Sequence, residues 1–364
     1  MTGQIEKLEM ASVVVSPRTT WTLVRLAAGG ETGLGECSDG GTSHELKEAL
    51  RLASPAVIGS ETTGAEQIAG EVLAALSSAV KPLLASTVAG AVELACLDLL
   101  GKLEAQPLWK LLGGTDPGPV DLYANINRGA SPRTPGGFAA LGARAVTDGF
   151  RALKCAPFDD PANGAALAKS GLAVVEAIRA AVGPEVRVMV DVHNRLPLEE
   201  VVALLPDLER LEIAWLEDAV AFDQPDELRY LSTLTCIPLA GGEMCSEPDL
   251  LQPSLGKGGL RIVLPDVKHA GGLLAARRLA QLAASQGAEV SPHNPTSPVG
   301  CAGSLQLAAL VPSLSVLEFA YGEVGWRPVC VLPEERPLAG RLTLPAGPGL
   351  GVTTNPKFIE FRSL

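Results

Sequence analysis

The chain has little positive charge relative to its negative charge. Its 364 residues include 29 Lys and Arg against 41 Asp and Glu, which gives a formal net charge of −12 at pH 7. Nucleic acids and anionic membrane surfaces are bound through clustered basic residues, and no such cluster is visible along this sequence. We therefore expect neither kind of partner.

Paired-cysteine motifs, nucleotide-binding loops and targeting segments are also missing. The seven cysteines are odd in number and show no CxxC spacing, which fits a reducing compartment better than a disulfide framework. No GxGxxG or GxxxxGKS/T motif follows a predicted strand, so no nucleotide cofactor is expected. The segment from Met1 to Lys7 has no basic stretch followed by an apolar run. We expect a cytoplasmic protein without a signal peptide or a membrane span.

The hydrophobic content of 47% and the charged content of 19% indicate a compact protein with a large core. Residues 20–27 alternate loosely, and a Gly-rich turn separates them from residues 34–37, which predicts a β-hairpin. Apolar residues at helical spacing then follow Ser86, which we interpret as a helix N-cap. These signals predict an α+β domain over residues 1–115, completed by a Gly- and Pro-rich tail over residues 335–364.

From Val120 onward the chain alternates short apolar segments with Ala- and Leu-rich helical stretches. Eight strands are predicted: 120–125, 150–154, 186–192, 213–216, 237–240, 261–264, 288–291 and 315–319. Eight strands alternating with helices favour a closed α/β barrel over an open doubly wound sheet. The predicted barrel domain covers residues 116–334.

Ionisable residues recur directly after these predicted strands. The spacings between consecutive members are 26, 26, 23, 27 and 25 residues for the series Asp191, Glu217, Glu243, Asp266, His293 and Glu318. Such a period is about the length of one strand-plus-helix unit in a barrel, where functional groups collect at the C-terminal ends of the strands. We therefore expect the six side chains to converge on one pocket.

Three carboxylates of this series occupy equivalent positions. Asp191, Glu217 and Glu243 would offer hard oxygen ligands, with positions left for water and substrate, which suits Mg²⁺. Any one of them alone is more simply a loop acid or a helix cap. Three in phase, each directly after an apolar run, favour a metal site.

Two of the four histidines lie in the same predicted pocket. Asp266 and His293 follow neighbouring strands, so the carboxylate could hold one imidazole nitrogen while the other accepts a proton. His193 lies two residues after Asp191 and would face the same side of an extended segment, a suitable place for an acid. The alternatives are a solvated loop histidine for His293 and a backbone-bonded histidine at the edge of the core for His193.

The ordered motifs resemble those of the enolase superfamily, mandelate racemase subgroup. They are Leu153-Lys154, Val190-Asp191-Val192-His193-Asn194, Trp215-Leu216-Glu217-Asp218, Gly241-Gly242-Glu243, Pro265-Asp266 before Gly271-Gly272, and Ser291-Pro292-His293-Asn294. The resemblance covers essentially the whole chain. It implies an α+β capping domain that closes a modified TIM barrel, (β/α)7β, with segments near residues 14–22 and 38–46 that help to select the substrate.

The resemblance also implies a reaction that begins with removal of the proton α to a carboxylate. Mg²⁺ would be bound by the three carboxylates named above. His293 and Asp266 would form the base dyad, and Glu318 would hydrogen-bond the substrate carboxylate as it gains charge. The substrate would be a small carboxylate, and a homo-oligomer would be expected.

One departure from the subgroup narrows the expected reaction. Racemases of this subgroup carry a Lys-x-Lys motif at the second barrel strand, and here the match is Lys154-Cys155-Ala156, without the second lysine. The Asp-x-His motif instead resembles that of acid-sugar dehydratases, galactonate and mannonate types among them, in which His193 would protonate the departing β-hydroxyl. Lys154 would then act near the substrate carboxylate.

Further substrate contacts are expected from Asn125, Thr20 and Trp21, although loop capping is an equal alternative for Asn125. Two other functions stay open. One is a racemase, epimerase or lactone cycloisomerase in which Lys154 reaches the opposite face of the substrate. The other is a catalytically silent protein that binds metal and a sugar acid.

Overall fold

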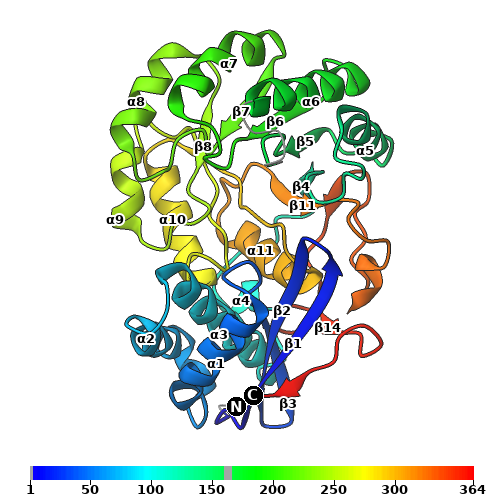
Figure 1. Cartoon of the computed structure of the whole chain (residues 1–364). Helices are drawn as coiled ribbons and strands as arrows, with labels where there is room; N and C mark the ends of the chain where they lie inside the picture. The colour runs from blue at the N-terminus through cyan, green and yellow to red at the C-terminus, as the bar shows by residue number, and fades with distance from the viewer. Residues whose placement is uncertain (1–2, 160–165) are drawn as a thin grey trace.

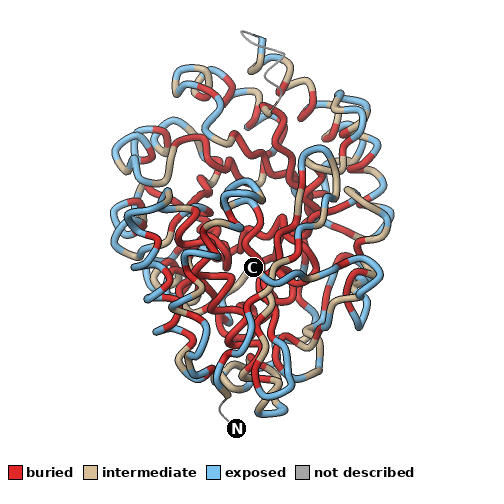
Figure 2. The backbone as a smooth tube through the Cα atoms, turned by 60° about the horizontal axis from the view of Figure 1, so that its bottom comes forward, coloured by how far each residue is buried: buried red, intermediate tan, exposed pale blue. Residues whose placement is uncertain are grey.

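The computed structural model describes residues 3–159 and 166–364, and it consists of an α+β unit and a barrel of parallel strands (Figure 1). The buried backbone runs through the centre of both parts, and exposed segments form the rim (Figure 2).

The first unit contains an antiparallel sheet with the strand order β15-β1-β2-β3. Its members are β1 (Lys7–Ser16), β2 (Thr19–Ala28), β3 (Glu31–Glu36) and β15 (Arg362–Ser363). The hairpin predicted from the sequence is confirmed: Gly29 and Gly30 connect β2 and β3 with φ of +58° and +83°, a region that glycine adopts without strain. Strand β15 comes from the other end of the chain, and Ser363 pairs with Glu9 of β1.

Helices cover one face of this sheet. They are α1 (Ser43–Val57), the short η1 (Thr62–Gly64), α2 (Ala65–Leu76), α3 (Pro82–Leu103) and α4 (Leu108–Leu111). The prediction of Ser86 as an N-cap is wrong. Helix α3 begins earlier, at Pro82, whose fixed φ suits a first helical position, and the Ser86 hydroxyl bonds to the Leu83 carbonyl inside the helix.

Helix α3 is the central helix of this unit. Its length and a mean hydropathy of 1.8 would suit a membrane span, but 89% of that window is buried inside the protein. It packs directly on β3, where the glycines allow close approach: a Cβ atom at Gly35 would lie 1.9 Å from the carbonyl oxygen of Ala91. The apolar character of α3 is therefore that of a core helix.

Eight parallel strands form the barrel, and all eight predicted strands are found. They are β4 (Val120–Asn125), β5 (Ala152–Cys155), β6 (Arg187–Asp191), β7 (Ile213–Glu217), β8 (Leu239–Gly241), β9 (Ile262–Val263), β10 (Glu289–Val290) and β11 (Leu317–Ala320). Strand β11 pairs with β4, and a bridge between Val290 and Leu314 joins β10 to the segment before β11, which closes the ring.

One helix follows each of the first seven strands. These helices are α5 (Pro135–Thr147), α6 (Leu167–Val182), α7 (Leu198–Arg210), α8 (Pro225–Leu234), α9 (Pro248–Leu251), which η3 (Gln252–Ser254) extends, α10 (Leu273–Ser285) and α11 (Pro298–Leu310). The last segments are η4 (Arg327–Cys330), the pair β12 (Val331–Leu332) and β14 (Thr353–Thr354), and β13 (Arg341–Leu342), which pairs with β4. Within the described residues this is the expected (β/α)7β arrangement.

The inside of the barrel is arranged in layers because alternate strand residues point inward. A buried cluster includes the residues two positions before Asn125, Lys154, Asp191, Glu217 and Glu318, which are Tyr123, Ala152, Met189, Trp215 and Val316. This apolar layer fills the barrel beneath the polar side chains at the C-terminal ends of the strands. The centre of the barrel is therefore packed.

Buried carboxylates of the first unit bind the N-termini of barrel helices. Glu36 of β3 accepts hydrogen bonds from the amides of Ser297 at 3.1 Å and Gly300 at 3.0 Å, at the start of α11. Glu93 of α3 accepts from the Leu274 amide at 3.4 Å, at the start of α10. Negative charge is favourable at a helix N-terminus, where amide groups lack intrahelical partners. These contacts fix the capping unit on the barrel.

The close approach of β3 to α3 makes a stability prediction. Gly35→Ala should lower the free energy of unfolding by about 1–3 kcal/mol, because the new methyl group would overlap the α3 backbone. The matched control is Gly70→Ala on the exposed side of α2, where a Cβ meets no atom within 4 Å. That change should leave stability unchanged or raise it by up to about 1 kcal/mol. Urea unfolding of both variants would measure the difference, and equal stabilities would contradict the packing argument.

Candidate active site

Three carboxylates converge at the C-terminal ends of neighbouring strands. Asp191 ends β6, Glu217 ends β7 directly beside it in register, and Glu243 follows β8 by two residues. One oxygen from each lies within 4.8 Å of the others, and all three side chains are buried. Three hard oxygen donors in this arrangement are suited to a divalent cation such as Mg²⁺.

The electrostatics of these three groups also favour a cation. Burial raises the pKa of Glu217 to about 8, and burial together with the nearby Asp218 and Asp191 raises that of Glu243 well above its usual range. The Glu243 Oε2 atom has no hydrogen-bond partner among the described residues. Burial alone would raise the pKa of Asp191, but His193 and Lys154 lower it to about 2. A bound cation would stabilise the charged form of all three carboxylates.

Lys154 lies at the centre of this group. It comes from β5, it is only 2% exposed, and its Nζ atom contacts Glu217 Oε1 and lies 3.7 Å from Asp191 Oδ2 and 3.5 Å from Glu318 Oε1. Burial would lower the pKa of Lys154, but Glu217 and Glu318 raise it well above the usual value. The side chain is therefore held in its charged form.

His293 and Asp266 form a hydrogen-bonded pair. The distance from His293 Nδ1 to Asp266 Oδ2 is 2.8 Å, and His293 Nε2 lies 3.2 Å from Glu243 Oε2. Burial would raise the pKa of Asp266, but Lys268 and His269 hold it well below its usual range. Because Asp266 is ionised, Nδ1 carries the hydrogen of this bond, and Nε2 faces the carboxylate group.

A second set of possible metal donors surrounds Asp266. One donor atom each from Asp266, His269 and His293 lies within 4.8 Å of the others. Here, however, the Lys268 Nζ atom lies 3.0 Å from Asp266 Oδ2, and the Thr87 hydroxyl is 2.9 Å from His269 Nδ1. The ammonium group already supplies positive charge, so these residues support the His293 pair and we assign no metal to them.

His193 is held between two carboxylates. Its Nε2 lies 2.7 Å from Asp191 Oδ2, and its Nδ1 lies 2.7 Å from Asp159 Oδ1. Burial would lower the pKa of His193, but Asp191 and Asp159 raise it to about 12, so the ring is a doubly hydrogen-bonded imidazolium. We predicted this placement from an extended backbone, and that prediction of the backbone is wrong. His193 has φ +50° in a turn after β6, and this turn brings the ring back to Asp191.

Glu318 ends the series on β11 and is bonded on both oxygens. Oε1 accepts a hydrogen bond from the Asn125 side chain on β4, and Oε2 accepts one from the Asn294 amide at 2.8 Å. Burial would raise the pKa of Glu318, but Lys154 and His293 lower it. The structure thus places all six residues of the predicted series, together with Lys154, His193 and Asn125, at one end of the barrel.

Thr20 and Trp21 lie on β2 and not in a loop. Trp21 is 1% exposed, and its ring packs edge-on against Trp326 with 5.5 Å between centroids. Their contact with substrate stays a prediction.

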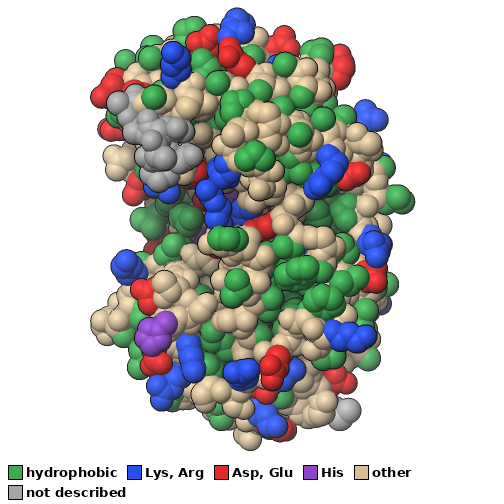
Figure 3. All heavy atoms as spheres, turned by 45° about the vertical axis from the view of Figure 1, so that its right-hand side comes forward, with side chains coloured by type: hydrophobic (Ala, Val, Ile, Leu, Met, Phe, Trp, Pro, Cys, Tyr) green, Lys and Arg blue, Asp and Glu red, His purple; other side chains and the backbone are tan. Residues whose placement is uncertain are grey.

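The tip of the β1–β2 hairpin reaches the barrel, where the Ser16 hydroxyl donates to Glu323 Oε1 at 2.7 Å. A hollow lies between the two parts of the molecule, with acidic, basic and histidine side chains gathered in it (Figure 3).

Several groups in the site were missed by the sequence reasoning. Asp159 follows β5 just as the other acids follow their strands, so the same rule could have found it. Asp218 directly follows Glu217, and burial raises its pKa to about 7. Nothing in the sequence pairs Lys268 with Asp266, because their contact depends on the loop after β9.

Comparison with known proteins agrees with this geometry. Residues 137–358 match the family described as "Enolase C-terminal domain-like", and residues 5–113 match the N-terminal domain of the mandelate racemase / muconate lactonizing enzyme family. The chain belongs to the enolase superfamily. The resemblance inferred from the ordered motifs is therefore confirmed, and metal dependence is general to this family.

Several named proteins are similar to this chain at modest sequence identity. A D-xylonate dehydratase of Haloferax volcanii is 27% identical over 98% of this chain and 88% of its own length. A D-gluconate dehydratase of Thermoproteus tenax is 30% identical over a stretch that covers 76% of this chain and 56% of that protein. A D-galactarolactone cycloisomerase of Agrobacterium fabrum is 27% identical over 92% of this chain and 88% of its own length.

A solved structure from Rubrobacter xylanophilus has the same architecture over the whole chain. This mandelate racemase/muconate lactonizing enzyme-like protein has a TM-score of 0.87 and 26% identity, with 98% of this chain and 96% of that chain covered. Both the capping unit and the barrel are therefore shared.

The raised carboxylate pKa values make a prediction for the metal-free protein. A group whose pKa is higher when folded favours folding in its protonated form, so stability should fall as pH rises from about 5 to about 8, through the pKa of Glu217. Mg²⁺ should restore stability, and its effect on the melting temperature should be larger at the higher pH, because it competes with protons. Thermal melts with and without Mg²⁺ would measure this.

Glu243→Gln is the matched variant for this measurement. It keeps the shape of the side chain but removes a charge that burial disfavours, so the metal-free variant should be at least as stable as the parent at about pH 8. It should also lose most of the stabilisation by Mg²⁺. An undiminished Mg²⁺ effect in this variant would exclude Glu243 as a ligand.

Proposed function

We propose that this protein is a Mg²⁺-dependent dehydratase that removes water from a sugar acid, an aldonate or aldarate, and yields a 2-keto-3-deoxy acid. The observation that carries the proposal is the pair of histidines beside the carboxylate group. His293 is bonded to Asp266 and turns its free nitrogen toward the site, whereas His193 is a protonated ring held by Asp159 and Asp191. One suits a base and the other suits an acid.

His293 would remove the α-proton. Its Nδ1 hydrogen is held by Asp266, so Nε2 is the nitrogen that accepts the proton, and the ionised Asp266 stabilises the imidazolium that forms. Lys154 and Glu318 would lie beside the substrate carboxylate as it becomes an enediolate. Mg²⁺, bound by Asp191, Glu217 and Glu243, would supply positive charge that stabilises this enediolate.

His193 would complete the elimination. Its proton would pass to the β-hydroxyl, the carbon–oxygen bond would break, and water would leave as the electron pair of the enediolate forms the new double bond. The resulting enol would tautomerise to the 2-keto-3-deoxy acid. Asp159 and Asp191, which contact the two ring nitrogens, raise the pKa of His193 and favour its protonated form.

The dehydratase names of two relatives support this reaction class, and the missing second lysine argues against proton exchange on both faces. The second candidate is an epimerase or lactone cycloisomerase, which the similarity to the Agrobacterium cycloisomerase favours. In that reaction Lys154 would serve the opposite face of the substrate. A cytoplasmic location and a homo-oligomeric state stay predictions.

A substrate screen in D₂O would separate the two candidates. We expect a Mg²⁺-dependent keto acid from at least one member of a library of aldonic acids, aldaric acids and their lactones, because elimination ends in a ketone. Keto-acid formation would be read chemically and deuteration at the α-carbon by NMR. Deuteration or isomerisation without a keto product would assign the protein to the second candidate.

Single histidine variants would separate the two proton transfers. His293→Asn should abolish exchange of the α-proton with solvent, and His193→Asn should retain exchange but lose dehydration, because only the second step needs its proton. Glu227→Gln, which alters an exposed side chain on α8 away from the site, is the control and should be fully active. Full turnover in either of the first two variants would remove that histidine from the mechanism. A parent protein that binds Mg²⁺ and a sugar acid but turns over no substrate, and whose binding survives both substitutions, would support a binding role for the site.

A further inference from the structure

The N-terminal end of the barrel carries a cavity of about 570 Å³. It lies at the opposite end of the strands from the carboxylate group, since Asp121, Ala152 and Arg187 are at or near the first residues of β4, β5 and β6. Its lining residues are Asp121, Leu122, Gly149, Arg151, Ala152, Arg187, Ser315, Val316, Ala339, Gly340 and Arg341. It is therefore separate from the candidate active site.

The side chains that line this cavity are positively charged overall, whereas the whole chain is negatively charged. Three arginines, Arg151, Arg187 and Arg341, come from three different segments, and Asp121 is the only carboxylate of the lining. Arg341 Nε pairs with Asp121 Oδ1 at 2.6 Å. Arg151 and Arg187 form no ion pair within the part of the chain that the structure describes. A protein with a net charge of −12 thus concentrates unneutralised guanidinium groups at one cavity.

The backbone gives the cavity a defined wall. Gly149 and Gly340 have φ of +95° and +72°, and they lie so close that a Cβ at Gly340 would be 2.7 Å from the Gly149 carbonyl oxygen. Strand β13 then places Arg341 opposite Asp121 of β4 in register. The arginines of this wall are therefore carried on paired backbone segments.

The floor of the cavity is the apolar layer of the barrel. The Arg187 guanidinium carbon lies 5.9 Å from the centre of the Trp215 ring, within the range of a cation–π contact. On its other side Trp215 donates from Nε1 to Glu217 Oε2 at 3.0 Å. A ligand that contacts Arg187 would therefore change the surroundings of Trp215 without entering the active site.

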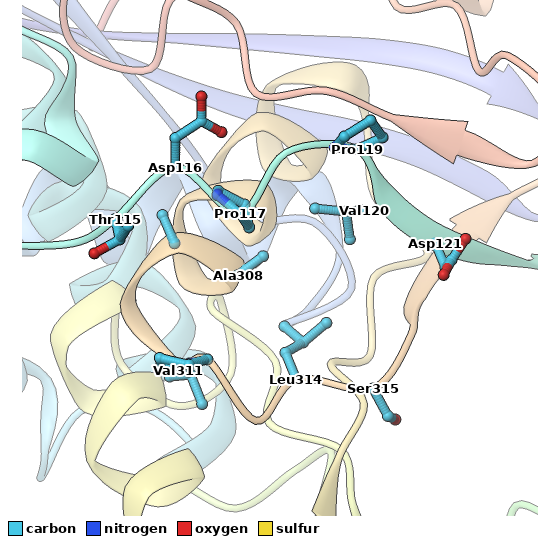
Figure 4. Close-up of a pocket in the computed structure, with 12 residues that line it drawn as sticks. Thr115, Asp116, Pro117, Pro119, Val120, Asp121, Ala308, Val311, Leu314 and Ser315 are labelled. Atoms are coloured by element: carbon cyan, nitrogen blue, oxygen red, sulfur yellow. The ribbon is translucent and has the colours of Figure 1, made fainter.

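An adjacent cavity of about 450 Å³ shares Asp121 and Ser315 with this one but differs in charge (Figure 4). Its remaining lining consists of apolar residues, Thr115 and the acidic Asp116, and it contains no Lys or Arg. It offers nothing that would hold an anion. Of these two adjacent cavities, the arginine-lined one has that chemistry.

We propose that the arginine-lined cavity binds a small multiply charged oxyanion, either a phosphoryl dianion or a dicarboxylate. Guanidinium groups present planar pairs of donors that match the oxygens of both classes. Arg151 and Arg187 contribute the unneutralised charge, and Arg341 contributes donors beyond its bond to Asp121. The proposal does not depend on the reaction at the other end of the barrel.

Isothermal titration of the full chain with inorganic phosphate, and separately with succinate, tests the proposal. Ionic strength is held constant with sodium chloride, so that general charge screening does not change. At least one anion should bind saturably, and tryptophan emission should change over the same concentrations. Arg151→Gln and Arg187→Gln should each weaken binding by about tenfold or more, because each removes charge-assisted hydrogen bonds.

Arg261→Gln is the matched control. Arg261 is also an exposed arginine directly before a barrel strand, but it does not line the cavity, so binding should change by less than about twofold. Saturation by phosphate alone, or by succinate as well, would support the proposal and identify the ligand class. Absence of saturation with both anions, or equal weakening by Arg261→Gln, would overturn it. A changed oligomeric state in the Arg151 and Arg187 variants without anion binding by the parent would assign these arginines to a contact between copies.

Discussion

The buried carboxylates at the C-terminal end of the barrel need compensating positive charge, and the arrangement of the site depends on how that charge is supplied. Asp191, Glu217 and Glu243 are brought together by the parallel strands, and burial raises the pKa of the two glutamates. Isolated carboxylates in such surroundings would be costly. Lys154 and His193 supply part of the compensating charge within the chain, and the remaining deficit explains why these groups suit a divalent cation.

The same constraint gives the two histidines different properties. His193 is surrounded by carboxylates, and they hold it in the charged form. His293 bonds to only one strongly ionised carboxylate, Asp266, whose own charge is neutralised by Lys268. Two identical side chains beside the same carboxylate group thus become candidates for opposite roles, because both nitrogens of His193 lie against carboxylates, whereas His293 is hydrogen-bonded to Asp266 through Nδ1.

Buried acids also position the capping unit above this end of the barrel. Glu36 and Glu93 bind the N-termini of α11 and α10, and Asp98 accepts from the Leu350 amide of the C-terminal tail at 2.7 Å. For Glu93, burial raises the pKa to about 8, although the amides of Leu274 and Leu273 and the charge of Arg278 lower it. Glu36 and Glu93 therefore attach the capping unit to backbone donors of the barrel helices, and Asp98 attaches it to the C-terminal tail.

The sequence by itself determined the strand positions, the barrel class and the residues that gather at one end. Apolar runs are local, and the residue after a parallel strand must lie at the same rim. Only the tertiary structure decided the partners: Asp159 for His193, Lys268 for Asp266, and Lys154 among three carboxylates. The start of α3 and the turn at His193 were predicted wrongly, since Pro82 and a left-handed backbone set them. Contacts between loops form only when the ring of strands closes, and no local sequence pattern predicts which loops then meet.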